Sequence, residues 1–408
     1  MLNTSIRGLL IAFLLALILS PARAQAQSAF CSDPGCKATR QTFRELCDYI
    51  VANKGSGPSI IRKGKTINAI FIAGYYMRTL VAGYEILGDQ RYLDTAIAYG
   101  DTLLKDQMPS GYWATGYGPV YFADTGSALG LFIVLYKHVD RERQKRYLDS
   151  VQRYVDSLEK DGMLLPNGAL GVGWEHTEDG KLNGPIPDKY TISSALTGGE
   201  IFTWMYYMTK KDQYRRMAYN SLRWIFTTMR KDGVIPYVLA AYGSSLEKHG
   251  DPRNDYQLWD ELPYLTAAYV GEGLLSFDIH SDQAAWNAEL RKDAKPMVEW
   301  LLSTQNANGS WSHPSHEPGC RAVFDLTRTP GIANTLIWYY NHVDKDPRVL
   351  SAVKKFDQFL LNPEEAKEFG QLNQGAAFIQ GCNDRDTATS LTGYAFSDIL
   401  VPGISSRW

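Results

Sequence analysis

Two kinds of helical pattern alternate along the chain. In the first kind, apolar residues recur every three or four positions and charged residues lie opposite them, which predicts a helix with one face in water. Glu142, Arg143, Lys145 and Arg146 are charges of such a face. We expect these amphipathic helices over residues 39–52, 90–105, 143–160, 211–230, 284–304 and 347–361.

The second kind of pattern is apolar on nearly every side. Small residues come first and bulky ones follow, as in Thr125-Gly126-Ser127-Ala128 ahead of Leu131-Phe132-Ile133. A helix without a polar face needs cover on all sides, so these helices should lie inside the molecule. We expect them over residues 66–87, 124–138, 193–208, 260–277, 329–342 and 387–400.

Strict alternation of the two kinds predicts a repeated hairpin, in which a Gly-containing turn ends the amphipathic helix and an aromatic-rich loop leads to the apolar one. Each hairpin can bury its apolar helix only against its neighbours, so closure into a ring removes exposed ends. We therefore predict an all-α fold, an (α/α)6 toroid that forms a single domain over residues 27–408, with no strand run interrupting it. An open α-solenoid is the alternative, but its repeats are usually shorter and more uniform.

The first 26 residues predict a secretory signal peptide. An apolar core over Leu9–Leu19 is followed by small residues suited to cleavage, such as Ala24-Gln25-Ala26. The core is short for a membrane span and no later run resembles one, so we expect an exported protein, secreted or periplasmic, without a membrane partner after cleavage.

Composition narrows the partners further. The formal net charge is -2, and no basic patch or tail is evident, which argues against binding to nucleic acid or to an anionic membrane. The 25 Tyr and 10 Trp residues are typical of carbohydrate clefts, where rings stack on sugars, but also of any large core. We expect a monomer.

Five cysteines remain after processing, and export would permit disulfides. We expect Cys320 to pair with Cys382, because each precedes an apolar helix by a few residues in loops that should be neighbours. Cys31, Cys36 and Cys47 lie close together near the mature N-terminus, and their pairing stays open.

Two carboxylates stand at the start of the fourth apolar helix. Asp260 occupies the position of a capping residue, Glu261 follows it, and Pro263 is tolerated only in a first turn. In a purely structural interpretation, Asp260 is only a cap and Glu261 is only a charge favoured by the helix dipole. Recurrence of such acidic, aromatic entrances along the chain favours a functional role.

These stretches resemble a known superfamily. Leu258-Trp259-Asp260-Glu261-Leu262-Pro263-Tyr264 and the helix led by Asp124 are similar to two motifs of the unsaturated glucuronyl and rhamnogalacturonyl hydrolases. These enzymes belong to the six-hairpin glycosidases, whose (α/α)6 barrel the chain resembles over its mature length. A whole hairpin separates the two aspartates here, more than in that family, and its usual C-terminal pattern is absent. The superfamily also holds polysaccharide lyases and sugar epimerases, so the fold constrains the chemistry only partly.

The loops that enter the apolar helices should gather at one end of the ring, where long functional loops usually form a site. They are rich in rings, carboxylates and guanidinium groups. The candidate substrate-binding residues are Trp113, Tyr117, Trp174, His176, Tyr190, Tyr256, Trp259, Trp311, Arg321 and Arg385.

Glycoside hydrolysis needs one carboxyl to protonate the leaving oxygen and another to activate water or attack the sugar. Asp124 and Asp260 could fill these roles, with Glu261 or Asp255 beside Asp260 to keep it protonated. A lyase or epimerase would instead use a base such as His176 or Tyr190, with Arg321 or Arg385 binding a uronate carboxylate. A non-catalytic glycan-binding toroid is a third alternative.

The sequence gives little sign of a cofactor. His313, His316 and Cys320 suggest zinc ligands, but two prolines stiffen this loop and Cys320 is expected in a disulfide. No phosphate-binding loop is evident. We therefore expect a carbohydrate substrate, no metal and no cofactor.

Overall fold

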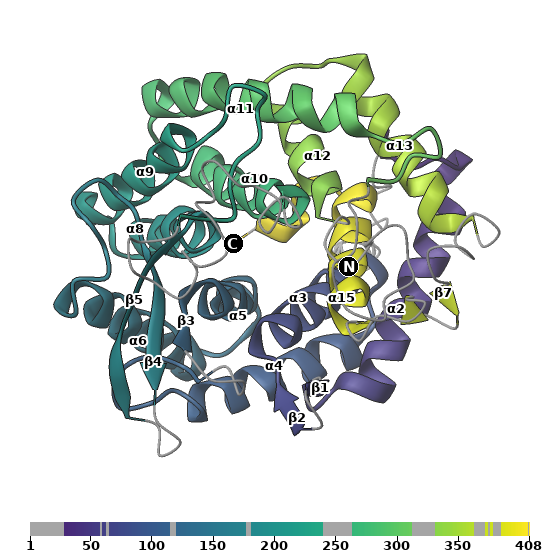
Figure 1. The fold of residues 1–408 in the computed structure, drawn as a ribbon. Coiled ribbons are helices and arrows are strands. Elements are labelled where there is room, and N and C mark those ends of the chain that lie inside the picture. Colours follow the sequence, from purple (N-terminus) through teal and green to yellow (C-terminus); the bar gives the residue numbers. More distant parts are fainter. Residues whose placement is uncertain are drawn as a thin grey trace, which may run out of the picture.

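The computed structural model describes residues 28–57, 59–62, 65–114, 120–176, 181–239, 263–311, 331–362, 372–373, 376–377, 385–406 and 408. Within these residues the chain is mostly helical, and its helices form two concentric rings (Figure 1). No helix among them is long and apolar enough to cross a bilayer.

The inner ring consists of the apolar helices. Each contacts the next, and the last contacts the first, so the ring is closed as the sequence predicted (Figure 1). In order these are α3 (Ile70–Leu87), α5 (Phe122–Leu135), a continuous helix made of α7 (Thr191–Ser193), the π-helical η3 (Ser194–Ile201) and α8 (Phe202–Thr209), then α10 (Pro263–His280), α12 (Ile332–His342) and α15 (Arg385–Leu400).

The outer ring consists of the amphipathic helices α2 (Lys37–Lys54), α4 (Gln90–Lys105), α6 (Arg141–Lys160), α9 (Asp212–Thr227), α11 (Ala284–Thr304) and α13 (Pro347–Leu361). The bounds of α4, α11 and α13 are those predicted. Asp89, Asp140 and Asp346 start α4, α6 and α13, because each side chain accepts a hydrogen bond from a first-turn amide.

Within four of the hairpins, a turn glycine follows the outer helix. Gly111, Gly168, Gly233 and Gly309 follow successive outer helices and have φ between +89° and +94°, which residues with a Cβ rarely adopt. A Cβ at each would also lie 2.2 to 2.9 Å from a backbone carbonyl oxygen of the next outer helix. These turns can pack against the next helix only because glycine has no side chain.

Strands interrupt the helical pattern, so the prediction of an uninterrupted all-helical run is wrong. An antiparallel sheet in the order β3-β4-β5-β6 lies beside α5 (Figure 1) and also contacts α7. Two short hairpins accompany it. The strands are β1 (Ser59–Arg62), β2 (Lys65–Asn68), β3 (Val120–Tyr121), β4 (Gly171–His176), β5 (Leu182–Tyr190), β6 (Val238–Leu239), β7 (Leu372–Asn373) and β8 (Ala376–Ala377).

The sequence did not predict the strands, because glycine and proline in β4 and β5 interrupt the alternation of polar and apolar residues that is typical of a strand. At Gly173 of β4 a Cβ would lie 1.6 Å from the carbonyl oxygen of Val120, so glycine is what lets β4 pair with β3. The helix α3 begins at Ile70 and not at the predicted position 66, because residues 65–68 are paired in the β1–β2 hairpin.

Of the cysteines, Cys31 is bonded to Cys36, and Cys47 is a free, buried thiol. This decides the pairing that the sequence left open. The predicted bond between Cys320 and Cys382 lies outside the described residues and stays a prediction.

Candidate functional site

Asp124 is a carboxylate at the entrance to the ring. It lies in the first turn of α5 and is half-buried. Asp386 is placed only as the second residue of α15, and the first turns of α3, α7, α10 and α12 contain no acidic residue. Helix α5 begins two residues earlier than the predicted start at 124, at Phe122, so Asp124 lies inside the first turn and is not the capping residue. Its carboxylate is nevertheless stabilised as an anion by the partial positive charge of the helix N-terminus.

Two buried hydroxyls lie on the helices at this entrance. Thr125 Oγ1, next to Asp124, and Ser193 Oγ on the contacting helix α7 have no hydrogen-bond partner. By contrast, Thr197 Oγ1 donates to the carbonyl oxygen of Phe122, the first residue of α5, at 3.2 Å. An unpaired buried hydroxyl costs about 1–3 kcal/mol, so Thr125 and Ser193 mark a place where a water or a ligand hydroxyl would be stabilised.

The four-stranded sheet adjoins the start of α5. Val120 of β3, just before α5, pairs with Trp174 of β4, and the Trp174 side chain is half-buried. His176 and Tyr190 are placed only as strand positions: His176 pairs with Leu182, whereas Tyr190 pairs with Val238 at the far end of β5. About 3.3 Å per residue along the strands keeps these two candidates for a lyase base from being neighbours.

Trp113 and Trp311 are not substrate-binding residues, contrary to the sequence prediction. Both are almost fully buried, at 1% and 0% exposure. Each indole N–H donates to a backbone carbonyl of the preceding outer helix, Trp113 to Leu103 and Trp311 to Leu301, both at 2.8 Å. The residues fill the space between outer helices, where no sugar could stack on them.

Several predicted site residues fall outside the described residues. These are Asp260, Glu261, Tyr117, Tyr256, Trp259 and Arg321, together with the possible zinc ligands His313, His316 and Cys320. Arg385 is placed only as the first residue of α15. Among the described residues, no group of three His, Cys, Asp or Glu side chains could hold a metal ion.

An ionic cluster that sequence reasoning missed lies on the inner ring. Arg78 of α3, 3% exposed, forms ion pairs with Glu200 of η3, at 2.9 Å, and with Glu272 of α10. Tyr75 donates its hydroxyl hydrogen bond to Glu272 at 2.7 Å, and the Arg78 guanidinium lies 5.0 Å from the Tyr394 ring centre. The available signal was a charged residue in the middle of each of three apolar helices, since a buried charge requires a partner.

The two glutamates of this cluster share one positive charge. Burial and, to a smaller extent, the nearby Glu272 raise the pKa of Glu200 well above its usual range, although Arg78 opposes the shift. We therefore assign a proton to Glu200. Both carboxyl groups are 0–2% exposed and bound to the same guanidinium, so they leave no room between them for a sugar and a water. The cluster therefore has a structural role, because it links three inner helices of the ring. Carboxyl groups for catalysis would have to come from the loops and first turns at the entrance.

The C-terminal segment fills the centre of the ring. The last short helix, η6 (Ile404–Ser406), is buried, and Arg78 donates a hydrogen bond of 3.5 Å to the carbonyl oxygen of Ser405 (Figure 1). Asp398 of α15 accepts hydrogen bonds from the amide and hydroxyl of Ser405 at 3.2 and 2.9 Å. Along its axis the ring is therefore filled by protein at the end opposite Asp124.

Comparison with solved structures identifies the fold. The chain is similar to an unsaturated glucuronyl hydrolase from Bacillus sp. GL1, at 16% identity and a TM-score of 0.58, over 89% of this chain and 94% of that one. It is also similar to a polysaccharide lyase, at 14% identity and a TM-score of 0.61, over 88% and 96% of the two chains.

A third similar structure is an inactive variant of an α-1,6-mannanase from Salegentibacter sp. HEL1_6 with bound α-1,6-mannotriose, at 13% identity and a TM-score of 0.59, over 90% and 98%. No protein-family model and no curated protein matches the chain. At these identities the similarity shows the fold alone. The protein has the (α/α)6 toroid of the six-hairpin glycosidases, as the sequence predicted.

Proposed function

We propose that the protein is an exported glycoside hydrolase that acts on a poly- or oligosaccharide, with uronate-containing glycans as the first class to test. The observation that carries the proposal is the position of Asp124: a half-buried carboxylate in a helix first turn, at the entrance of a closed ring whose other end is filled. The oligosaccharides bound to similar toroids support a carbohydrate as substrate.

In this proposal Asp124 acts as the anionic carboxylate, since the start of α5 favours its charged form. It would activate a water or attack the sugar. Asp260 would be the acid that protonates the leaving oxygen, with Glu261 or Asp255 as the like charge that keeps it protonated. The similar mannanase is inactive when two consecutive aspartates are asparagines, and Asp260-Glu261 is a consecutive acidic pair in this chain.

A lyase is the second candidate, because a polysaccharide lyase is among the similar structures. It would remove the proton alpha to a uronate carboxylate and leave a carbon–carbon double bond in the product. Hydrolysis creates a new reducing end without that double bond. Reading both signals on uronate-containing and neutral polysaccharides therefore separates the two reactions.

The proposal is tested by the variants Asp124→Asn and Asp260→Asn on whichever glycan the protein cleaves. Each should lower turnover by about 100-fold or more while the unfolding midpoint hardly moves, because asparagine keeps the shape but cannot take up or deliver the proton. Asp94→Asn, on the outer helix α4, is the matched control and should keep full activity. A fully active Asp260→Asn enzyme would end the assignment of Asp260. If Asp260 is only a cap, its alanine variant should instead lose about 1 kcal/mol of stability.

Export is the remaining part of the proposal and rests on the N-terminal sequence. Cleavage after Ala24 or Ala26 would leave a mature chain that begins at Gln25 or Gln27. N-terminal sequencing of the protein from the periplasmic or extracellular fraction checks this. An intact Met1 on protein from the cytosolic fraction alone would contradict it.

A further inference from the structure

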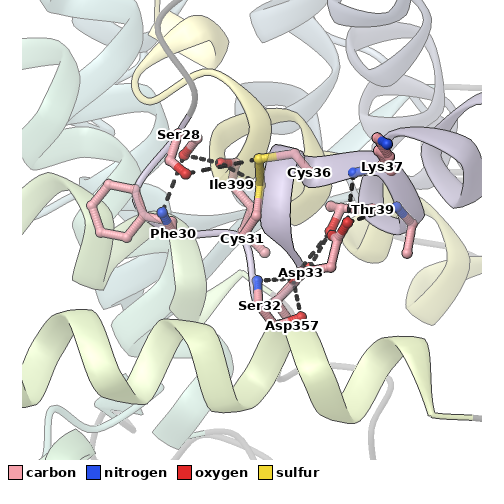
Figure 2. Close-up of a disulfide and its surroundings, with 11 residues drawn as sticks. Ser28, Phe30, Cys31, Ser32, Asp33, Cys36, Lys37, Thr39, Asp357 and Ile399 are labelled. Atoms are coloured by element: carbon pink, nitrogen blue, oxygen red, sulfur yellow. Dashed lines mark hydrogen bonds between the residues drawn. A yellow bond between two sulfur atoms is a disulfide. The ribbon is translucent and has the colours of Figure 1, made fainter.

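The N-terminal segment Ser28–Cys36 lies where the ring closes (Figure 2). Here the first outer helix, α2, contacts the last hairpin, α13 and α15. Elsewhere in the ring, successive hairpins are joined by the chain itself. At this seam they are held only by side-chain and backbone contacts, so a segment that bridges it can decide how firmly the ring is closed.

The segment bonds to the last outer helix through one carboxylate. Asp357 of α13 is fully buried and accepts hydrogen bonds from both the amide and the hydroxyl of Ser32, each at 2.7 Å. Thr39 of α2 donates to the same carboxylate at 3.0 Å. Burial raises the pKa of Asp357, and the bonds from Ser32 and Thr39 oppose this shift by stabilising the anion. Asp357 of the last outer helix is thus a shared acceptor for α2 and for the N-terminal segment.

The same segment also contacts two inner helices, α15 and α12. Ser28 donates its hydroxyl hydrogen bond to the carbonyl oxygen of Ile399 in α15 (Figure 2). The Phe30 ring is 2% exposed and packs edge-to-face on Tyr340 of α12, with ring centres 5.4 Å apart. The segment therefore has one anchor on each of three elements across the seam.

The disulfide between Cys31 and Cys36 holds this segment in shape. It closes a loop that contains Ser32, the residue bonded to Asp357, and Asp33, whose carboxylate accepts hydrogen bonds from the first amides of α2. Gly35 and Cys36 have φ of +79° and +54°, and a left-handed backbone is unfavourable for cysteine. Without the covalent bond, the loop would adopt many conformations in which Ser32 does not donate its hydrogen bonds to Asp357.

We propose that the segment Ser28–Cys36 is a redox-locked clasp that holds the first outer helix against α13 and α15. Oxidation of the two thiols, with loss of two electrons and two protons to an oxidant such as a disulfide reagent, forms the bond and fixes the clasp. A dithiol reverses this step: the S–S bond breaks, two thiols form and the dithiol becomes a cyclic disulfide. The ring would then be fully closed only in a compartment that permits disulfides. This inference rests on the contacts at the seam and not on the proposed catalytic function.

The test is hydrogen exchange on the full chain and on its Cys31→Ser/Cys36→Ser variant. The variant should exchange its amides about tenfold faster or more in α2, α13 and the end of α15, because these elements lose their tie and open locally. Helices α6 and α9, on the far side of the ring, are the internal control and should keep their protection (Figure 1).

Two further samples complete the test. Ser32→Ala keeps the disulfide but loses the hydroxyl bond to Asp357, and should loosen the same helices to a smaller extent. It also keeps the test usable if the double variant does not fold. Dithiothreitol should loosen α2 and α13 in the wild type but have no further effect on them in the double variant. Unchanged protection of α2 and α13 in these samples, or a loss spread equally over α6 and α9, would overturn the proposal.

Discussion

Trp113 and Trp311 make the same hydrogen bond in two different hairpins of the ring. Each indole donates at 2.8 Å to the carbonyl of the leucine ten residues earlier, Leu103 or Leu301. Gln107 and Gln305 occupy equivalent positions between the leucine and the tryptophan. Each side-chain amide donates, at 2.8 to 2.9 Å, to the carbonyl of the turn glycine four residues later. Residues 103–113 and 301–311 are thus two copies of one turn, and their tryptophans have the same structural role.

We expect Trp311→Ala to lower the free energy of unfolding by about 3–5 kcal/mol, because it removes a fully buried ring that packs on Phe356. The activity per folded molecule should not change. Urea unfolding and an assay of the folded protein measure the two quantities. Loss of activity at unchanged stability would restore Trp311 to the substrate site.

Gly309→Ala should be strongly destabilising. The new Cβ would lie 2.3 Å from the carbonyl oxygen of Lys355, so the turn would have to move away from α13, at about 1–3 kcal/mol beyond the backbone strain. Gly162→Ala is the matched control, because Gly162 also has positive φ, +69°, but nothing lies within 4 Å of its added Cβ. Thermal unfolding of the two variants side by side gives the packing contribution as their difference. Equal melting temperatures would show that the close approach is not a constraint.

Glu200→Gln and Glu272→Gln should differ sharply. If Glu200 holds the proton, glutamine replaces a neutral group by a neutral group and stability should change by only about 1 kcal/mol. Glu272→Gln would leave Arg78 without its counter-ion and should cost about 3–5 kcal/mol. Chemical unfolding at neutral pH measures both. The opposite order would contradict the assignment of a proton to Glu200.

Asp398 should make stability depend on pH. Burial raises its pKa to about 6, despite hydrogen bonds from Asn334 and Ser405 that favour the charged form. A carboxyl whose pKa is higher in the folded protein favours folding when protonated. This contribution, roughly 3 kcal/mol, is complete below about pH 4 and is lost as the pH rises through about 6. Unfolding midpoints from pH 4 to 8 should therefore fall less steeply in Asp398→Asn than in the wild type. Parallel profiles would contradict the assignment.

The sequence by itself determined the order of helices and the identity of the two rings. Periodicity and capping are local: Asp89 and Asp346 are bonded to amides two residues away, so α4 and α13 begin where the sequence predicts. Closure also followed from local patterns, because an apolar helix needs neighbours on every side. The Gly-containing turns were recognisable for the same reason, although not the helix against which each one packs.

The tertiary structure alone decided which polar and aromatic residues are structural. Arg78 lies 122 residues before Glu200 and 194 residues before Glu272 in the sequence, and only ring closure brings the three together. The β3–β6 sheet depends on a pairing between distant segments, which a glycine at position 173 permits but no local pattern indicates. The sequence predicted that Trp113 binds substrate, because the sequence alone does not show whether a tryptophan is exposed or buried. Its burial is set by the packing of the next outer helix, which is a property of the closed ring.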